Sequence, residues 1–476
     1  MDAIVAVDTI IDLAELLSTC IDACRRGCEV IRNVRHKSLH GTSDILDSVL
    51  YKIADDPRSA LTEADGASQK VIIECLTSCW EKHIKAGRIR IVGEEEDEHS
   101  TDLECDNSFD TAYSEDIMSH FDNYNCPRPD LEPIQRDMFE SVSSPGCSKE
   151  PPESTEIGDS NISKQGESVT QHDEIIIFID PMDGTREFVE GRIQNVQCLI
   201  GITVNGLPVA GAMGMPMVHD HQIEIAYGLI SSQKTNNMEE GESFTTTAVP
   251  VLSGVKFFES INPLDILPKP TKEDQDVAES GDGADDDDGT LMVYSGDSMK
   301  PALNLAMDCL VNRILRGTGE EDEVNIIPGA EEGVNSMHPP IRKIVAGGCG
   351  HKILSLQRHV QSLSSRHKSD EQEYTTVGAI SIGPPGSSSW DTAAPTAVLL
   401  AVDPNARVTD LFGQPLIYDG DNLSNKLGIV VSSGYVASRI HEALCMKLSQ
   451  DEALHEVLGV SMSSKTQSNA LELDNL

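Results

Sequence analysis

The stretch Ile175-Ile-Ile-Phe-Ile-Asp-Pro-Met-Asp-Gly-Thr185 places a short apolar run directly before two carboxylates. Five consecutive apolar residues are typical of a strand buried on both faces, and the residues after the stretch favour a helix. Pro181 stiffens the connection, while Gly184 permits a backbone angle that other residues avoid. The stretch therefore predicts a strand, a turn and a helix, with Asp180 and Asp183 facing one point.

The two carboxylates and the main-chain carbonyl of Met182 offer oxygen ligands on this turn. Hard divalent cations such as magnesium bind oxygen, so the turn could supply half of a metal site. The backbone N–H groups of Gly184 and Thr185 open the helix, where the positive end of the helix dipole favours a phosphate. Taken alone, the same string could be a solvated, capped turn.

The elements on either side of this stretch predict an α+β first domain. Apolar residues recur at helical spacing from residue 8 to about 34 and from 65 to about 85. Beyond the central stretch, apolar runs at 196–204 and 208–214 are joined by Asn205-Gly206, a strong hairpin signal. We therefore expect helices packed on a largely antiparallel sheet.

The second half of the chain has a different element order. A strand, helix, strand order at residues 290–294, 301–310 and 341–345 predicts an α/β domain. Residues 96–174 hold 21 acidic and four basic residues, a composition typical of disorder, with an acidic docking segment as the alternative. We expect an α+β metal-binding domain over 1–230, which contains an acidic insertion at about 98–172. A variable acidic insertion over 231–289 then leads to an α/β domain over 290–462. The chain ends in a flexible tail over 463–476. A strand at 249–258 stays possible.

Composition limits the class of function. The formal net charge of -43 over 476 residues repels nucleic-acid polymers and anionic membrane surfaces, so we expect neither as a partner. The sequence shows no signal peptide and no long apolar run, which predicts a soluble cytoplasmic protein. The twelve cysteines lack disulfide-scaffold density. Cys20, Cys24 and Cys28 share a helix face, where buried thiols are expected and a metal or redox cluster is the alternative.

Two further strings carry acidic residues that suit metal binding. Gly93-Glu94-Glu95 follows a segment at 88–92 that alternates like a short strand, and Trp390-Asp391 precedes a run of small residues with a helical pattern. Asp391 is expected at the N-cap of that helix. An acidic loop and an ordinary capped helix are the plain alternatives for the two strings.

Taken in order, these strings resemble the signatures of the inositol monophosphatase superfamily, which are Gly-Glu-Glu, Asp-Pro-x-Asp-Gly-Thr and Trp-Asp-x-Ala-Ala. The resemblance extends to Thr62-Glu-Ala-Asp65, which comes before the glutamates. The resemblance implies a layered αβαβα sandwich and a magnesium-dependent, lithium-sensitive phosphomonoesterase. Asp65 and Thr185 would position and deprotonate the attacking water. Two or three Mg²⁺ ions would be held by Glu94, Asp180, Asp183, Asp391 and the carbonyl of Met182.

Within the superfamily, Glu190-Gly191 and residues 347–352 and 390–395 resemble the 3′(2′),5′-bisphosphate nucleotidases. The resemblance implies removal of the 3′-phosphate from adenosine 3′,5′-bisphosphate. Asp297 and Ser388-Ser389 depart from that pattern, because a histidine and basic residues are usual there. Inositol polyphosphate 1-phosphatase or inositol monophosphatase activity is therefore the alternative, and a catalytically silent scaffold is a third. The implied substrate contacts are Gly184, Thr185, Ser298, Gly348 and Lys352.

Overall fold

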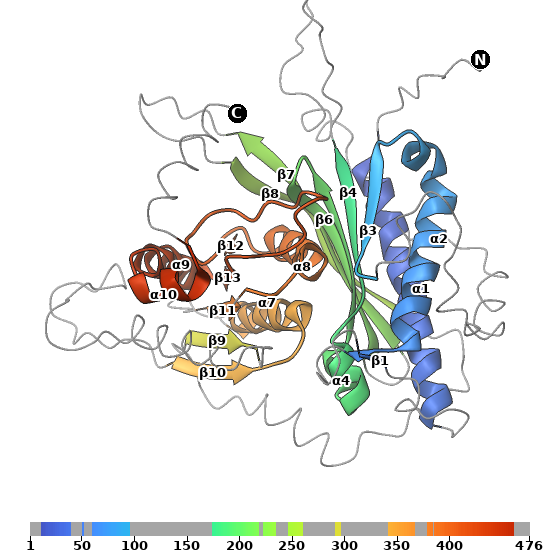
Figure 1. Cartoon of the computed structure of the whole chain (residues 1–476), viewed down its shortest axis with the longest axis horizontal. Helices are drawn as coiled ribbons and strands as arrows, with labels where there is room; N and C mark the ends of the chain where they lie inside the picture. The colour runs from blue at the N-terminus through green and yellow to red at the C-terminus, as the bar shows by residue number, and fades with distance from the viewer. Residues whose placement is uncertain are drawn as a thin grey trace, which may run out of the picture.

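The computed structural model describes residues 11–39, 50–51, 60–95, 174–218, 222–234, 246–259, 291–296, 341–366, 378–383 and 385–460. Within them, helices and sheets alternate across the molecule in five layers, as Figure 1 shows. Two helices cover a six-stranded sheet, two more separate it from a five-stranded sheet, and a last pair covers the outer face. The expected αβαβα sandwich is confirmed.

The first sheet has the strand order β3-β4-β5-β6-β7-β8, in which β3 is parallel to β4 and the other neighbours are antiparallel. Along β4, Ile177 and Ile179 pack against α1 (Leu13–Leu39) and α2 (Glu63–Lys85), whereas Phe178 faces α8 (Ser389–Val402). Because side chains alternate along a strand, the next residue on the α8 face is Asp180. The strands are β3 (Ile89–Gly93), β4 (Ile175–Asp183), β5 (Gln197–Val204), β6 (Leu207–Val218), β7 (Gln222–Lys234) and β8 (Thr246–Glu259).

The last strand of this sheet, β8, was only a possibility from the sequence. β8 pairs antiparallel with β7, from Gln222 opposite Glu259 to Lys234 opposite Thr246. The possible strand at 249–258 is therefore confirmed, although it lies in a stretch that we expected to be a variable insertion. Proline and glycine interrupt its apolar pattern and weaken the sequence signal. The domain boundaries stay a prediction.

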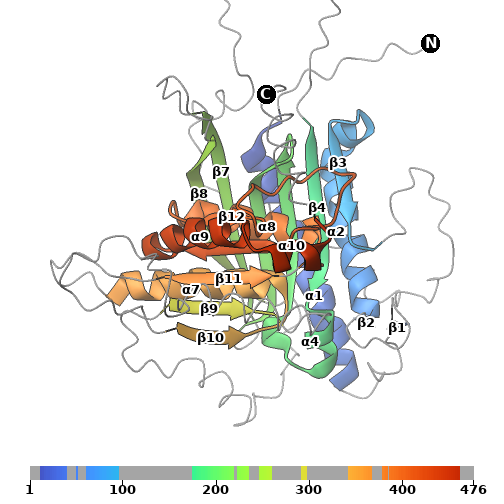
Figure 2. The ribbon, with the colours of Figure 1, turned by 60° about the vertical axis from the view of Figure 1, so that its left-hand side comes forward.

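The second sheet has the order β10-β9-β11-β13-β12, and its strands run across those of the first sheet, as Figure 2 shows. One face packs on α9 (Tyr435–Leu448) and α10 (Glu452–Leu458), and the other on α7 (Cys349–Arg366) and α8. The strands predicted at 290–294 and 341–345 are confirmed to within one residue. The bounds are β9 (Leu291–Ser295), β10 (Ile341–Val345), β11 (Ala379–Gly383), β12 (Arg407–Thr409) and β13 (Ile429–Ser433).

Close packing of α8 on the first sheet places the start of this helix above the end of β4. Gly201 of β5 pairs with Gly211 of β6, which in turn pairs with Gly228 of β7, so a row without side chains crosses three strands. A Cβ atom on Gly201 or Gly211 would lie only 2.6 Å from main-chain atoms of Ala394. The small residues of α8 pack closely against this row, and this close packing brings Asp391 near Asp180.

α1 begins at Leu13, where Oδ1 of Asp12 accepts a hydrogen bond from the N–H of Ala14 at 2.9 Å and caps the helix. The first part of the predicted helix, residues 8–10, lies outside the described residues. The three cysteines of α1 are buried, and all eight cysteines in the described residues are free thiols. The expectation of buried thiols on one face of this helix is confirmed.

Some predicted segments lie outside the residues that the structure describes. The acidic insertion at about 98–172, the helix at 301–310 and the tail from 463 all lie outside the described residues. Among the helices that are described, none is both long and apolar enough to cross a membrane.

Candidate active site

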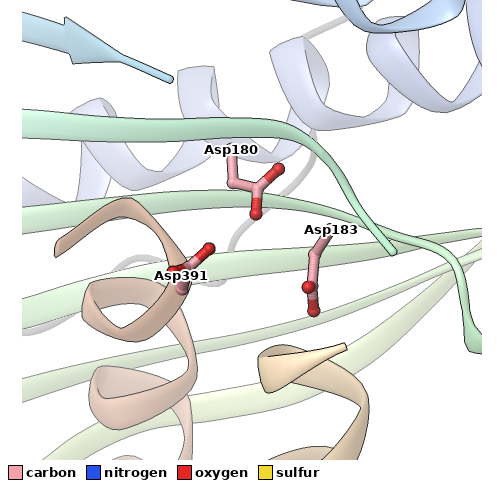
Figure 3. A group of neighbouring side chains, drawn as sticks. All are labelled: Asp180, Asp183 and Asp391. Carbon is pink, nitrogen blue, oxygen red and sulfur yellow. The ribbon is translucent and has the colours of Figure 1, made fainter. Parts of the chain in front are cut away.

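The acidic strings of the sequence meet where β4 ends and α8 begins. One carboxylate oxygen from each of Asp180, Asp183 and Asp391 lies within 4.8 Å of the other two. Figure 3 shows the three side chains gathered between the end of β4 and the first turn of α8. We call these three residues the aspartate cluster.

Asp180 is buried at the end of β4, with only 1% of its surface exposed. Its Oδ1 atom accepts a hydrogen bond from the main-chain N–H of Met182 at 3.0 Å. β4 continues irregularly to Asp183, so the predicted turn is in fact a bulged strand end. Burial, followed by the charges of Glu94, Asp183 and Asp391, raises the pKa of Asp180 well above its usual value.

Asp183 faces the first turn of α7. Its Oδ1 atom accepts the main-chain N–H of Cys349 at 3.1 Å, and its Oδ2 atom accepts that of Gly350 at 2.7 Å. These N–H groups have no partner inside the helix, so the carboxylate satisfies them. Burial raises the pKa of Asp183 to about 6, although the charge of Lys352 and the two N–H donors act in the opposite direction.

Asp391 is not the N-cap of α8, which corrects the sequence prediction. Ser388 is the N-cap, and Asp391 is the third helical residue, where its Oδ2 atom accepts the main-chain N–H of Ser388. The sequence Ser-Ser-Trp-Asp contains the capping-box pattern, in which the acidic residue lies three positions after the cap. Burial and the charges of Asp183 and Glu94 raise the pKa of Asp391 to about 7.

Glu94 follows β3 and lies beside the aspartate cluster. Its main-chain N–H donates to the carbonyl oxygen of Ile179 at 3.0 Å, which continues the pairing of β3 with β4 as far as Asp180. Its negative charge contributes to the raised pKa values of Asp180, Asp183 and Asp391. The structure therefore brings together the four carboxylates that the sequence singled out as metal ligands.

Asp65 and Thr185 form the hydrogen-bonded pair that the resemblance implied. The hydroxyl group of Thr185 lies 2.8 Å from Oδ1 of Asp65 and 3.2 Å from the carbonyl oxygen of Met182. Oδ2 of Asp65 accepts from the N–H and the hydroxyl group of Thr62, at 2.7 and 2.8 Å. Asp65 is thus the acidic partner in the capping box that starts α2.

The environment of Asp65 favours its protonated form despite these donors. Burial and the charges of Glu95 and Glu94 raise its pKa to about 7, against the opposing effect of the two donors on Thr62. A carboxyl group with a pKa near neutrality is suited to proton transfer.

The predicted substrate contacts are only partly described. Gly184 adopts φ 92° and caps the short helix α4 (Thr185–Glu190), as its glycine identity suggests. Gly348 adopts φ 69°, and a Cβ atom there would lie 3.0 Å from Oδ2 of Asp183. Lys352 is half-buried on α7 and acts electrostatically on Asp183. Ser298, together with Asp297, lies outside the described residues.

Two residues beside the site were missed by the sequence reasoning. The side-chain amide of Gln69, on α2, bonds to both the main-chain N–H and the main-chain carbonyl oxygen of Glu95. Its spacing of four residues from Asp65 places both on one helix face, a signal that could have indicated it. Glu187 is a buried carboxylate that accepts hydrogen bonds from Arg192 and Asn195, and no motif pointed to it.

The donor set of the aspartate cluster fits a hard divalent cation. Its three carboxylates are crowded together, and their pKa values are all raised by burial and by neighbouring negative charge. A cation would relieve this repulsion, and a site with only oxygen donors suits magnesium-like ions. Among the described residues, no other group of His, Cys, Asp and Glu side chains meets the same geometric test for a metal site.

Comparison with known proteins agrees with this geometry. The sequence profile of the inositol monophosphatase family matches residues 136–250. The 3′(2′),5′-bisphosphate nucleotidase 1 of Dictyostelium discoideum is 25% identical over 427 residues, which cover 89% of this chain and 94% of that protein. These matches support membership of the inositol monophosphatase superfamily. The same matches support a phosphatase activity, with small phosphorylated molecules as substrates.

Two further proteins are similar to this chain at lower identity. The 3′(2′),5′-bisphosphate nucleotidase 1 of Rattus norvegicus is 23% identical over 281 residues, covering 58% of this chain and 64% of that protein. The crystal structure of inositol monophosphatase II from Staphylococcus aureus is 13% identical, with a TM-score of 0.42, covering 93% of this chain and 99% of that one.

Proposed function

We propose that this phosphatase removes the 3′-phosphate from adenosine 3′,5′-bisphosphate and related sulfated nucleotides, with magnesium as its cofactor. The observation that carries the proposal is the convergence of Asp180, Asp183 and Asp391 to within 4.8 Å in a cluster whose first two residues are buried, with Glu94 beside them. The names of the relatives in Dictyostelium and rat support the nucleotide substrate over other small phosphates.

The residues proposed to hold two or three magnesium ions are Glu94, the aspartate cluster and the carbonyl of Met182. Magnesium in such a site supplies a water of lowered pKa and neutralises negative charge in an in-line displacement at phosphorus. The hydrogen bonds that the backbone donates to Asp180, Asp183 and Asp391 fix the direction of each carboxylate before any ion arrives. Such supporting hydrogen bonds are a usual feature of metal ligands.

Asp65 and Thr185 are proposed to move the proton of the attacking water. Thr185 donates its hydroxyl proton to Oδ1 of Asp65 at 2.8 Å, so the lone pairs of its oxygen are left to accept a proton from water. Thr62 saturates the other oxygen of Asp65, which restricts the carboxyl group to this one task. The carbonyl oxygen of Met182, at 3.2 Å, is the alternative acceptor for the same hydroxyl hydrogen.

Substrate recognition is proposed to use the groups around the aspartate cluster. The N–H groups of Gly184 and Thr185 would contact the phosphate that is removed, and Gly348 gives the close backbone approach beside Asp183. Lys352 is proposed to pair with the second phosphate of the nucleotide. Ser298 is a further proposed contact on sequence grounds. Inhibition by lithium and a cytoplasmic location are also proposed, the latter because the described cysteines are free thiols.

A phosphate-release panel tests this proposal directly. Adenosine 3′,5′-bisphosphate, inositol 1,4-bisphosphate and inositol 1-phosphate are compared at equal concentration, with magnesium and with a chelator. We expect the nucleotide to be the best of the three and all release to stop with the chelator. A strong preference for inositol 1,4-bisphosphate would replace the nucleotidase assignment by a 1-phosphatase one. No release from any substrate would favour a silent scaffold.

A further inference from the structure

Gln69 lies on α2, which packs on the other face of the first sheet from α8. It is buried, with 1% of its surface exposed. Its Nε2 atom donates to the carbonyl oxygen of Glu95 at 3.0 Å, and its Oε1 atom accepts the N–H of the same residue at 3.1 Å. One side-chain amide thus satisfies both polar groups of one residue, as a neighbouring strand would.

Gly93 makes this arrangement possible. A Cβ atom on Gly93 would lie 2.4 Å from Oε1, 2.7 Å from Cδ and 3.0 Å from Nε2 of Gln69, so any larger residue would displace the amide. This gives a physical reason for the glycine of the Gly-Glu-Glu string. It is the absence of a side chain at residue 93, and not an unusual backbone angle, that the contact requires.

Glu94 lies between two fixed points. On one side, its own N–H is bonded to the carbonyl oxygen of Ile179 at 3.0 Å. On the other, the peptide of Glu95 is held by Gln69. β3 ends at Gly93, so the sheet pairing alone does not fix the chain after Glu94. The second fixed point therefore depends on the amide of Gln69.

We propose that Gln69 is a positioning residue that holds Glu94 against the aspartate cluster and thereby sets the affinity of the site for magnesium. The inference deepens the proposed function and rests on it, because Glu94 matters only if it binds the ion. Without the amide, the peptide of Glu95 exchanges its partner for water, and the Glu94 carboxylate spreads over several positions. Each ion must then order the loop before it gains this ligand.

The test compares Gln69→Met, which keeps side-chain length and removes the amide, with Thr19→Val as a matched control. The indole N–H of Trp80 donates to the hydroxyl of Thr19 at 3.1 Å, so this control also removes a buried bond of α2, far from the aspartate cluster. The apparent Kd for Mg²⁺ is read from the rise in Tm over a magnesium chloride titration. We expect roughly a 10- to 100-fold weaker Kd for Gln69→Met and an unchanged Kd for Thr19→Val.

A second variant separates positioning from general damage. Gly93→Ala should weaken magnesium binding like Gln69→Met, and the double variant should be no worse than either single one, because both act through the same contact. Equal Kd values for Gln69→Met and the wild type would overturn the inference, as would a Thr19→Val protein that loses affinity equally. If the wild type binds magnesium but releases no phosphate, the proposed function fails while the positioning of Glu94 still stands or falls on the Kd values.

Discussion

Two helices of this protein begin with the same local motif and deliver an aspartate to the same site. At the start of α2, Thr62 and Asp65 form a capping box, and at the start of α8, Ser388 and Asp391 form another. Both aspartates are the third residue of their helix, and burial is the largest cause of a pKa raised to about 7 in each. Sequence-local rules alone would assign the two the same role.

The two aspartates differ in the groups that surround their carboxylate oxygens outside the capping box. Asp65 accepts from the N–H and hydroxyl of Thr62 and from the hydroxyl of Thr185, so both of its oxygens face hydrogen-bond donors even though nearby glutamates raise its pKa. Asp391 accepts a main-chain hydrogen bond only from the N–H of Ser388 among the bonds described, and the charge that acts on it most is that of Asp183. One carboxylate is therefore suited to holding a hydroxyl group and the other to binding a cation. The comparison teaches that tertiary neighbours, and not the capping motif, decide the chemistry.

The largest expected effect comes from neutralising the cation-binding member. Asp391→Asn removes one ligand charge, and turnover should fall by about 10³-fold or more, because a metal contributes several kcal/mol to transition-state stabilisation. Asp180→Asn should be at least as severe. The same substitutions should raise the Tm of chelator-treated protein, since they relieve repulsion. Steady-state phosphate release and thermal melts check both effects, and an Asp391→Asn enzyme with near-normal turnover would contradict the assignment.

Asp65→Asn is expected to have a smaller effect, on kcat and not on magnesium affinity. An amide presents one acceptor oxygen in place of two, so either Thr62 or Thr185 loses its partner. The rate constant kcat should fall by about 10²-fold, typical of lost proton-transfer assistance. The Kd for Mg²⁺ from thermal titration should stay near the wild-type value. Magnesium affinity that falls as far as in Asp391→Asn would remove the distinction between the two aspartates.

Lys352→Ala should have a still smaller effect, on substrate binding. If the amine pairs with the second phosphate, its loss is expected to raise KM about tenfold and to lower kcat little, since a remote contact is mainly uniform binding. Lys352 also lowers the pKa of Asp183, so the assay is run at saturating magnesium. Inositol 1-phosphate, with its single phosphate, is the control substrate. An equal rise in KM for that substrate speaks against a second-phosphate contact.

The pH dependence of metal-free stability gives the mildest test. Asp65, Asp183 and Asp391 have folded pKa values of about 7, 6 and 7 against an ordinary value of 3.8, so the folded state binds more protons than the unfolded chain between these limits. Their contribution to the stability of the folded state is fully present below pH 3.8 and is lost as pH rises through 6 to 7. The Tm in chelator should therefore fall from about pH 4 to pH 7 and level off above it, less so for Asp391→Asn. A fall of equal size in both proteins would place the titrating groups elsewhere.

The sequence predicts those parts of the site that rest on local patterns. The apolar run before Asp180 identifies a buried strand, and the resemblance of the acidic strings to the superfamily signatures implies which carboxylates converge. It misassigns Asp391 as an N-cap because serine and aspartate both cap helices, and only the backbone shows which of them is first. Gln69 was missed because its partner is the main chain of Glu95, which no residue type marks, and its spacing from Asp65 was the one available signal. β8 was only a possibility because Pro250 and Gly254 interrupt its pattern.

The dependence of phosphate release on free magnesium tests the central claim most directly. Release from adenosine 3′,5′-bisphosphate is measured for the wild type and Asp391→Asn over a range of free Mg²⁺ buffered by a chelator. The account predicts no release by the wild type without magnesium, saturable recovery as the ion is added, and little recovery by Asp391→Asn at any concentration. Release that is independent of magnesium, or equal in the two proteins, would contradict it.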